Sequence, residues 1–132
     1  MTTELTLLGW SLVLALFQVM LTAMFRNRET GTTYNAGPRD EPGPPVGVMT
    51  GRLRRAQANL LETLPLFATG VLIAHVAGRE GALTFWGAWL YLAARIAYVP
   101  AYALGVAYLR SAIWMVSMAG LVMILAAILR PA

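Results

Sequence analysis

Long apolar stretches alternate with shorter polar connections along this chain, and the pattern predicts four membrane-spanning helices. The first stretch covers residues 5–25, a run of 21 residues without a charged side chain. About 20 such residues cross the hydrocarbon of a bilayer as a helix. Three later stretches, 52–78, 82–104 and 110–129, have a similar length and are also mainly apolar. We therefore predict an all-α integral membrane protein, a four-helix up-and-down bundle with both termini on the same side.

The connections between these stretches differ in length and in composition. Residues 26–51 form a polar loop whose four prolines exclude a continuous helix. The turns around Gly81 and Gly105 are short, so each joins two antiparallel helices. A chain of 132 residues is long enough for one domain, and we assign residues 1–132 to it.

The second apolar stretch begins with polar side chains that share one face. They are spaced three and four residues apart, which places them on the same side of a helix. A carboxylate within an apolar segment is costly unless it is paired or faces water or protein. This polar stripe is therefore predicted to face the inside of the bundle, near one end of it. Its members are Arg52, Arg55, Asn59 and Glu62.

A second stripe runs along the third apolar stretch. It consists of Tyr91, Arg95, Tyr98 and Tyr102, again at helical spacings of three and four residues. Placing an arginine in mid-membrane costs about 2.5–3.5 kcal/mol by insertion measurements. Arg95 therefore needs a partner, and Glu62 is the carboxylate that the apolar stretches offer. We expect the two stripes to face each other, within one chain or between subunits.

Composition supports the membrane class and excludes several functions. Hydrophobic residues make up 58% of the chain and charged residues 12%, whereas soluble domains have about 25% charged residues. The absence of cysteine excludes disulfides, thiolate metal sites and a cysteine nucleophile. His75 is the single histidine and has no second ligand beside it, so no metal site is expected. The net charge of +4 is too small and too scattered for a nucleic-acid-binding protein.

All ten basic side chains are arginines, and they are unevenly distributed. Arginine suits bidentate contacts with carboxylates and phosphates, although a GC-rich genome would produce the same bias. The long loop with its flanks and the third connection hold seven arginines, against Arg79 and Arg130 on the opposite side. By the positive-inside rule, the loop faces the cytoplasm and the termini lie across the membrane. The seven are Arg26, Arg28, Arg39, Arg52, Arg54, Arg55 and Arg110.

The two stripes, Arg110 and the loop should meet in the cytoplasmic half of the bundle. Guanidinium groups, one carboxylate, one amide and tyrosine hydroxyls would form a polar, mainly cationic pocket. Such a pocket suits a small molecule with more than one carboxylate and an ammonium group, because arginine pairs with carboxylates bidentately and Glu62 could take the ammonium. The bilayer would supply a hydrophobic co-substrate. An arginine beside a bound thiol favours the thiolate, since it lowers a pKa that is otherwise about 8.5.

The polar stripe of the second stretch belongs to a longer pattern, Arg52-x-x-Arg55-Ala56-x-x-Asn59-x-x-Glu62-x-x-Pro65-x-Phe67. This pattern resembles the signature of the MAPEG family, the membrane-associated proteins in eicosanoid and glutathione metabolism. It is most similar to that of the microsomal glutathione transferases and microsomal prostaglandin E synthase. The resemblance covers essentially the whole chain in four-helix order. Further similar segments are Arg95-Ile96-Ala97-Tyr98 with Tyr102, Arg110-Ser111, and Pro38-Arg39-Asp40.

The resemblance implies a homotrimer of four-helix subunits that binds glutathione at each subunit interface, toward the cytoplasmic side. Hydrophobic electrophiles would approach from the membrane lipids, and no metal would take part. The resemblance is to a bacterial-type member, for which the inner membrane is the expected location. The implied chemistry is the conjugation of hydrophobic electrophiles, or the reduction of peroxides, by glutathione, as in detoxification.

The family's functional residues carry over onto matching positions of this chain. The resemblance implies that Arg110 stabilises the glutathione thiolate, with Ser111 and Asp40 as neighbours of the sulfur. It assigns seven side chains to the binding or support of glutathione. These are Arg52, Arg55, Asn59, Glu62, Arg95, Tyr98 and Tyr102.

Two positions depart from the family pattern. The mammalian synthases have an arginine where this chain has Ala58, so Arg54 or Arg39 would have to replace one contact with a glutathione carboxylate. Tyr98 stands where the family has a histidine on the third helix, and it still offers a hydroxyl group.

Two functions of different classes fit these residues. The first is an enzyme that activates the thiol of glutathione, or of another thiol, through Arg110. The second is a non-catalytic lipid-binding membrane protein of the same fold, as the five-lipoxygenase activating protein is within this family. The presence of Arg110 together with Arg55, Asn59 and Glu62 favours the enzyme.

Overall fold

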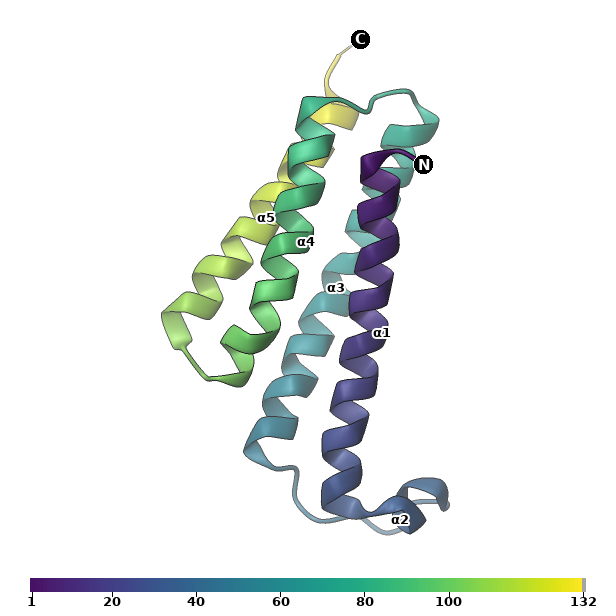
Figure 1. Cartoon of the computed structure of the whole chain (residues 1–132), viewed down its shortest axis with the longest axis vertical. Helices are drawn as coiled ribbons and strands as arrows, with labels where there is room; N and C mark the ends of the chain where they lie inside the picture. Colours follow the sequence, from purple (N-terminus) through teal and green to yellow (C-terminus); the bar gives the residue numbers. More distant parts are fainter. Residues whose placement is uncertain (132) are drawn as a thin grey trace.

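Four long helices run up and down through the computed structural model, which describes residues 1–131 (Figure 1). Both termini lie at one end of the bundle, and the long loop lies at the other (Figure 1). Each of the four is long and apolar enough to cross a membrane, which confirms the predicted all-α membrane bundle. The helices are α1 Thr3–Thr30, the short α2 Thr32–Ala36, α3 Val48–Val76, α4 Ala82–Ala103 and α5 Ala107–Leu129.

The helices α3 and α4 form the centre of the bundle, because each of them contacts the other three long helices. Their shared core contains Phe67 of α3 and Tyr91 of α4, both fully buried, with stacked rings whose centroids are 4.1 Å apart. The hydroxyl of Tyr91 is 2.9 Å from Oγ1 of Thr63 on α3. The hydroxyl group of the buried tyrosine therefore has a hydrogen-bond partner inside the apolar core.

Two glycines allow α4 and α5 to lie in direct backbone contact. A Cβ atom added to Gly87 would be 2.7 Å from the carbonyl oxygen of Gly120. A Cβ added to Gly120 would be 2.5 Å from the carbonyl oxygen of Gly87. Small residues at such crossings are typical of membrane helices, which associate mainly through close packing.

The ends of α1 and α3 reach further into the polar loop than the hydropathy pattern predicts. α1 continues to Thr30, and α3 begins at Val48. Polar side chains beyond the bilayer do not stop a helix, because its backbone hydrogen bonds are internal. Gly31, with a φ of 84°, ends α1. The four prolines lie between 37 and 47, outside the helices, as expected.

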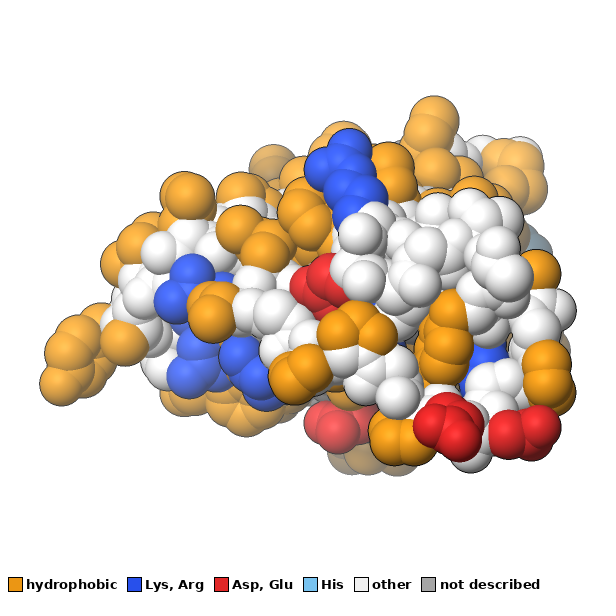
Figure 2. Space-filling view, turned by 90° about the horizontal axis from the view of Figure 1, so that it is seen from below, with side chains coloured by type: hydrophobic (Ala, Val, Ile, Leu, Met, Phe, Trp, Pro, Cys, Tyr) orange, Lys and Arg blue, Asp and Glu red, His pale blue; other side chains and the backbone are white. Residues whose placement is uncertain are grey.

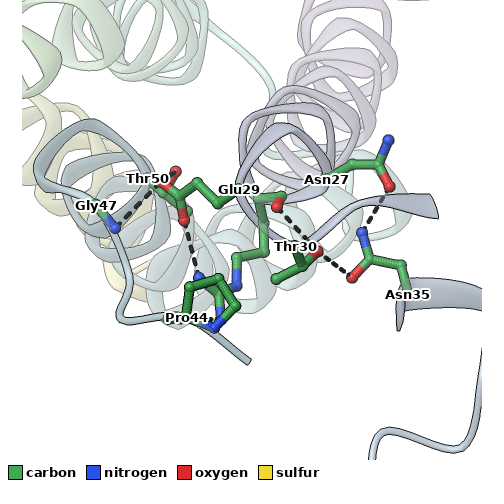
Figure 3. A network of polar contacts seen from close by, with 8 residues as sticks. Asn27, Glu29, Thr30, Asn35, Pro44, Gly47 and Thr50 are labelled. Carbon is green, nitrogen blue, oxygen red and sulfur yellow. Dashed lines mark hydrogen bonds and ion pairs between the residues drawn. The ribbon is translucent and has the colours of Figure 1, made fainter. Parts of the chain in front are cut away.

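A polar network fastens the loop to the end of α1 (Figure 3). The carboxylate of Glu29 accepts hydrogen bonds from the backbone N–H of Gly47 at 3.1 Å and from Oγ1 of Thr50 at 2.8 Å. Arg26 pairs with Glu29 at 2.9 Å and also donates to the carbonyl oxygen of Pro44 at 2.7 Å. This network fixes the entry of α3 relative to α1, at the end of the bundle where the candidate site lies.

At the opposite end, the N-terminus is tied to the turn between α3 and α4. Oγ1 of Thr2 donates to Glu80 at 2.7 Å, and Nδ1 of His75 lies 3.1 Å from the same carboxylate. Oγ1 of Thr84 donates to the buried Glu4 at 3.1 Å. Burial alone would raise the pKa of Glu80, but the hydrogen bonds from Thr2 and His75 outweigh this effect and lower the pKa.

Candidate functional site

A cavity of about 290 Å³ opens between α3, α4 and α5 on the loop side of the bundle. It combines one guanidinium group, one amide, two hydroxyl groups and two large apolar side chains. Several of the predicted site residues are thereby brought together from three helices. The lining residues are Asn59, Tyr98, Arg110, Ser111, Trp114 and Met115.

The turn before α5 places Arg110 and Ser111 at this cavity. Gly105 has a φ of 72°, a left-handed conformation that favours glycine, and the chain reverses there. α5 then begins at Ala107, so both residues lie in its first turns. Nη1 of Arg52 donates to the carbonyl oxygen of Ala103 at 3.1 Å, next to this turn. Arg52 therefore supports the turn and is absent from the cavity wall, although it belongs to the predicted stripe.

Tyr102 lies between two of the predicted cationic residues. Nε of Arg55 donates to its hydroxyl at 2.9 Å, and the guanidinium carbon is 5.6 Å from the ring centroid. The guanidinium carbon of Arg110 lies 5.0 Å from the same centroid. The aromatic ring attracts both cations and holds them close together at the edge of the cavity. Figure 2, seen from the loop end, shows one group of basic side chains on the left, the side of α4 and α5, and further basic side chains at the top and at the lower right, while acidic ones lie mainly toward the lower right.

Arg95 pairs with Asn59, whereas the sequence predicted Glu62 as its partner. Its Nη1 donates to Oδ1 of Asn59 at 2.8 Å, and its guanidinium carbon lies 4.3 Å from the centroid of the Tyr98 ring. Only 1% of Arg95 is exposed. The two predicted stripes thus face each other within one chain, but the contact is between an amide and a guanidinium group. The expected ion pair is absent from residues 1–131, because the Glu62 side chain faces outward from the single chain.

Two further predicted residues lie away from the cavity. Glu62 is exposed on α3 within its membrane-spanning part, and Asp40 is exposed in the loop. Neither lines the cavity that contains Arg110 and Ser111. The roles predicted for them therefore require a second copy of the chain or a movement of the loop.

A second, larger cavity of about 520 Å³ lies between α1, α2 and α3 on the same side of the bundle. Arg26, Arg39 and Arg54 contribute guanidinium groups to its wall, and Gln57 contributes an amide. Its remaining wall is partly apolar, from α1 residues such as Met20. Arg39 and Arg54 are the two residues predicted to replace the arginine missing at Ala58, and the structure places them together here.

Sequence reasoning assigned no role to several residues of these walls. Trp114 and Met115 line the cavity of Arg110, but they belong to the mainly apolar fourth stretch and to neither predicted stripe. Trp114 lies four residues after Arg110, and Met115 lies four residues after Ser111. The helical period could therefore have identified both. Gln57 lines the second cavity, and no predicted stripe contained it.

The arrangement suits the binding of an anion more than metal chemistry. Among the described residues no group of three His, Cys, Asp or Glu side chains could hold a metal ion. The cavity wall offers guanidinium, amide and hydroxyl groups without a carboxylate. Such donors stabilise a negatively charged group where the protein excludes water.

Comparison with known proteins identifies the family. The model of the MAPEG family matches residues 7–130, nearly the whole chain. No curated protein matches the chain closely enough to serve as a relative. The match to the family covers all four membrane-spanning helices and both cavities. The chain therefore belongs to the MAPEG family.

Proposed function

We propose that this membrane protein is a glutathione-dependent transferase and peroxidase, which activates the glutathione thiol and conjugates or reduces hydrophobic electrophiles. The observation that carries the proposal is the position of Arg110 in the wall of a cavity with Asn59, Tyr98 and Ser111. Membership of a family that includes glutathione transferases and peroxidases supports this class of reaction.

Glutathione matches the charges of the site. It carries two carboxylates, one ammonium group and a thiol, and arginine binds carboxylates with paired hydrogen bonds. Arg55 shares the ring of Tyr102 with Arg110 and would take one carboxylate. Asn59, Tyr98 and Tyr102 would bind polar atoms of the peptide, and Arg95 would support them from behind.

Arg110 would act on the sulfur. A guanidinium group next to the thiol stabilises the thiolate and so lowers the thiol pKa toward neutrality. The hydroxyl of Ser111 would donate a hydrogen bond to the same sulfur. The thiol proton leaves to solvent, and the thiolate attacks an electrophilic carbon of a hydrophobic substrate. With an aryl halide, a carbon–sulfur bond forms, the carbon–halogen bond breaks, and the halide ion leaves to solvent. Trp114 and Met115 give the cavity an apolar side against which such a substrate would pack.

A homotrimer would complete the site. Each chain has two cationic cavities at the same end, one at α3, α4 and α5 and one at α1, α2 and α3. A ring of identical subunits brings one face of each chain against a different face of its neighbour. Arg26, Arg39 and Arg54 of one subunit would then approach the cavity of the next and supply the second carboxylate contact. The exposed Glu62 would be covered in the same interface and would take the ammonium group.

The proposed location is a bacterial inner membrane, with the loop 26–51 in the cytoplasm. Seven arginines lie at the loop end and two at the end with the termini. This asymmetry supports the proposed orientation by the positive-inside rule, and in that orientation both cavities would be open to cytoplasmic glutathione.

Conjugation kinetics of the purified protein test the proposal. Turnover of a water-insoluble aryl halide with glutathione should fall about 10²–10³-fold in Arg110→Ala, the usual cost of removing one group that stabilises a developing anion. The KM for glutathione should change much less. Arg28→Ala is the matched control, since Arg28 is exposed at the same end and lines neither cavity. Equal turnover in Arg110→Ala and wild type, with a weaker KM alone, would contradict the catalytic role.

The second candidate is a non-catalytic lipid-binding protein. An apolar groove of α3 and α5, lined by residues such as Leu66, Met118 and Val122, supports it, because such a groove suits an acyl chain. This function predicts tight binding of a fatty acid and no conjugation by the wild type at any glutathione concentration.

A further inference from the structure

Arg95 is in an unusual position for a charged side chain. It is fully buried within a membrane-spanning helix, and its Nε and Nη2 have no hydrogen-bond partner among the described residues. Its polar contact is with Oδ1 of Asn59, and its cationic plane rests on Tyr98. Asn59 and Tyr98 both line the cavity of Arg110, whereas Arg95 does not. Arg95 therefore stands behind the cavity wall and contacts two of its members.

The chemistry of arginine decides which way the amide of Asn59 points. A guanidinium group has donors and no acceptor, so the amide atom that faces it must be the oxygen. The amide nitrogen, Nδ2, then faces away from Arg95. Nδ2 has no hydrogen-bond partner in residues 1–131 and is not among the buried unpaired atoms, so it is accessible from the cavity. Without Arg95, the amide could rotate and present its oxygen instead.

We propose that Arg95 is a positioning residue that locks the amide of Asn59, so that the cavity presents an N–H donor at this point. The site then selects an acceptor there, a carboxylate or a peptide carbonyl oxygen of the bound thiol, and rejects an ammonium group. This inference rests on the proposed binding of glutathione in the same cavity. It separates the role of Arg95, which acts through Asn59, from the role of Arg110 in the cavity wall.

The first part of the test needs no ligand. Thermal unfolding is measured in detergent for Asn59→Asp, Arg95→Met and the double variant. Asn59→Asp should unfold at or above the wild-type temperature, because a carboxylate pairs with the buried guanidinium better than an amide does. In the Arg95→Met background, the same change should lower the unfolding temperature, since it leaves a carboxylate unpaired. Additive effects of the two changes would show that the contact does not couple the residues, and would overturn the inference.

The second part measures glutathione affinity and turnover for the same variants. Asn59→Asp stays folded but presents an acceptor to the ligand, so its affinity for glutathione should fall at least about tenfold, the usual effect of losing a charge-assisted hydrogen bond. The KM for glutathione should rise in Asn59→Asp by a larger factor than the turnover at saturating glutathione falls, because the contact that changes is one with the bound thiol compound, and Arg110 is kept. Gly9→Ala is the control, since a Cβ at Gly9 meets nothing within 4 Å.

The outcomes separate this inference from the proposed function. Wild-type affinity in Asn59→Asp would overturn the inference and leave the proposed function in place, since the ligand would then not use an N–H donor at this position. If the wild type bound no glutathione while the stability effects were non-additive, the proposed function would fail and the locked amide would be supported. Additive stability effects overturn the inference whatever the affinities are.

Discussion

Tyr102 shows how one residue can organise the charges of this site. Its ring contacts the guanidinium groups of Arg55 and Arg110, and its hydroxyl accepts a hydrogen bond from Arg55. Two cations that would repel each other in a membrane-spanning protein are thereby held on one aromatic ring. Both are then available to a single ligand with more than one negative charge.

Replacing Tyr102 should separate the contribution of its hydroxyl group to glutathione binding from that of its aromatic ring. Tyr102→Phe removes the hydroxyl and keeps the ring, so the loss of about 0.5–1.5 kcal/mol for one hydrogen bond should weaken glutathione binding about two- to tenfold. Tyr102→Leu also removes the attraction between ring and cations and should weaken binding further. Isothermal titration with glutathione measures both. Identical affinities of the two variants would contradict a role for the aromatic ring.

At the residue scale, the sequence predicted which side chains share a face but not their partners. The spacing of Arg95 and of Asn59 placed each on a polar stripe, and the structure brings these two together. The sequence could not predict that Glu62 would face outward. A helical period shows which residues share a face of the helix, but it does not show whether this face points into the bundle or away from it. Arg52 illustrates the same limit, since its partner is a backbone carbonyl of another helix.

At the scale of helices, backbone contact between α4 and α5 positions the cavity. Gly87 and Gly120 face each other where the two helices are closest. The same pair of helices carries Tyr98, Arg110 and Trp114 toward the loop end. A change in the distance between α4 and α5 should therefore affect both stability and the site.

Gly120→Ala should destabilise the protein by about 1–3 kcal/mol, as overpacking of a tight core usually does. The added Cβ would meet backbone atoms at 2.5 and 2.9 Å, and backbone cannot move aside as a flexible side chain can. Thermal unfolding in detergent measures the effect. The matched control is Gly9→Ala on α1, which should be neutral or slightly stabilising, because alanine favours a helix more than glycine does. Equal unfolding temperatures of the two variants would contradict the close packing.

The contacts of Glu80 should make the attachment of the N-terminus depend on pH. The pKa of Glu80 is lowered in the folded protein, because hydrogen bonds from Thr2 and His75 outweigh its burial. A lowered pKa stabilises the fold above the ordinary value of 4.5, and this stabilisation is lost as the pH falls through the folded pKa. Unfolding temperatures between pH 7 and acidic pH should therefore fall less in Glu80→Gln than in wild type. A steeper fall in the variant would contradict this assignment.

Helix number and order could be predicted from hydropathy, whereas the helix ends could not. Membrane thickness sets the minimum length of an apolar span, but it does not limit a helix that continues into water. The extension of α1 to Thr30 and the early start of α3 at Val48 are stabilised by the contacts of Glu29. These contacts join residues far apart in the sequence, and no local pattern reveals them.

For the molecule as a whole, the two cationic cavities suggest how chains assemble. One cavity faces outward from α3, α4 and α5 and the other from α1, α2 and α3, both near the loop. Under the proposed function, the wall of each cavity on one chain would supply part of the groups that bind glutathione. The exposed carboxylate of Glu62 lies on α3, the membrane-spanning helix that contributes residues to both cavities, and contact of this carboxylate with lipid would be costly.

Native mass spectrometry from detergent should find three chains in each particle. Glu62→Leu removes a carboxylate that the proposed interface uses, so it should weaken glutathione binding although Glu62 lies outside the cavity of its own chain. Glu41→Leu, at an exposed loop carboxylate outside both cavities, is the control. Monomers with wild-type affinity for glutathione would contradict a site shared between subunits.

The ultraviolet absorbance of the thiolate, followed while glutathione is titrated into the purified protein near neutral pH, tests the central claim most directly. Wild type should give a saturable thiolate signal, and Arg110→Ala should give none at a concentration of glutathione that still fills the site. Arg28→Ala should behave like wild type. A wild-type protein that assembles correctly and binds glutathione without any thiolate signal would contradict thiol activation, as would an unchanged signal in Arg110→Ala.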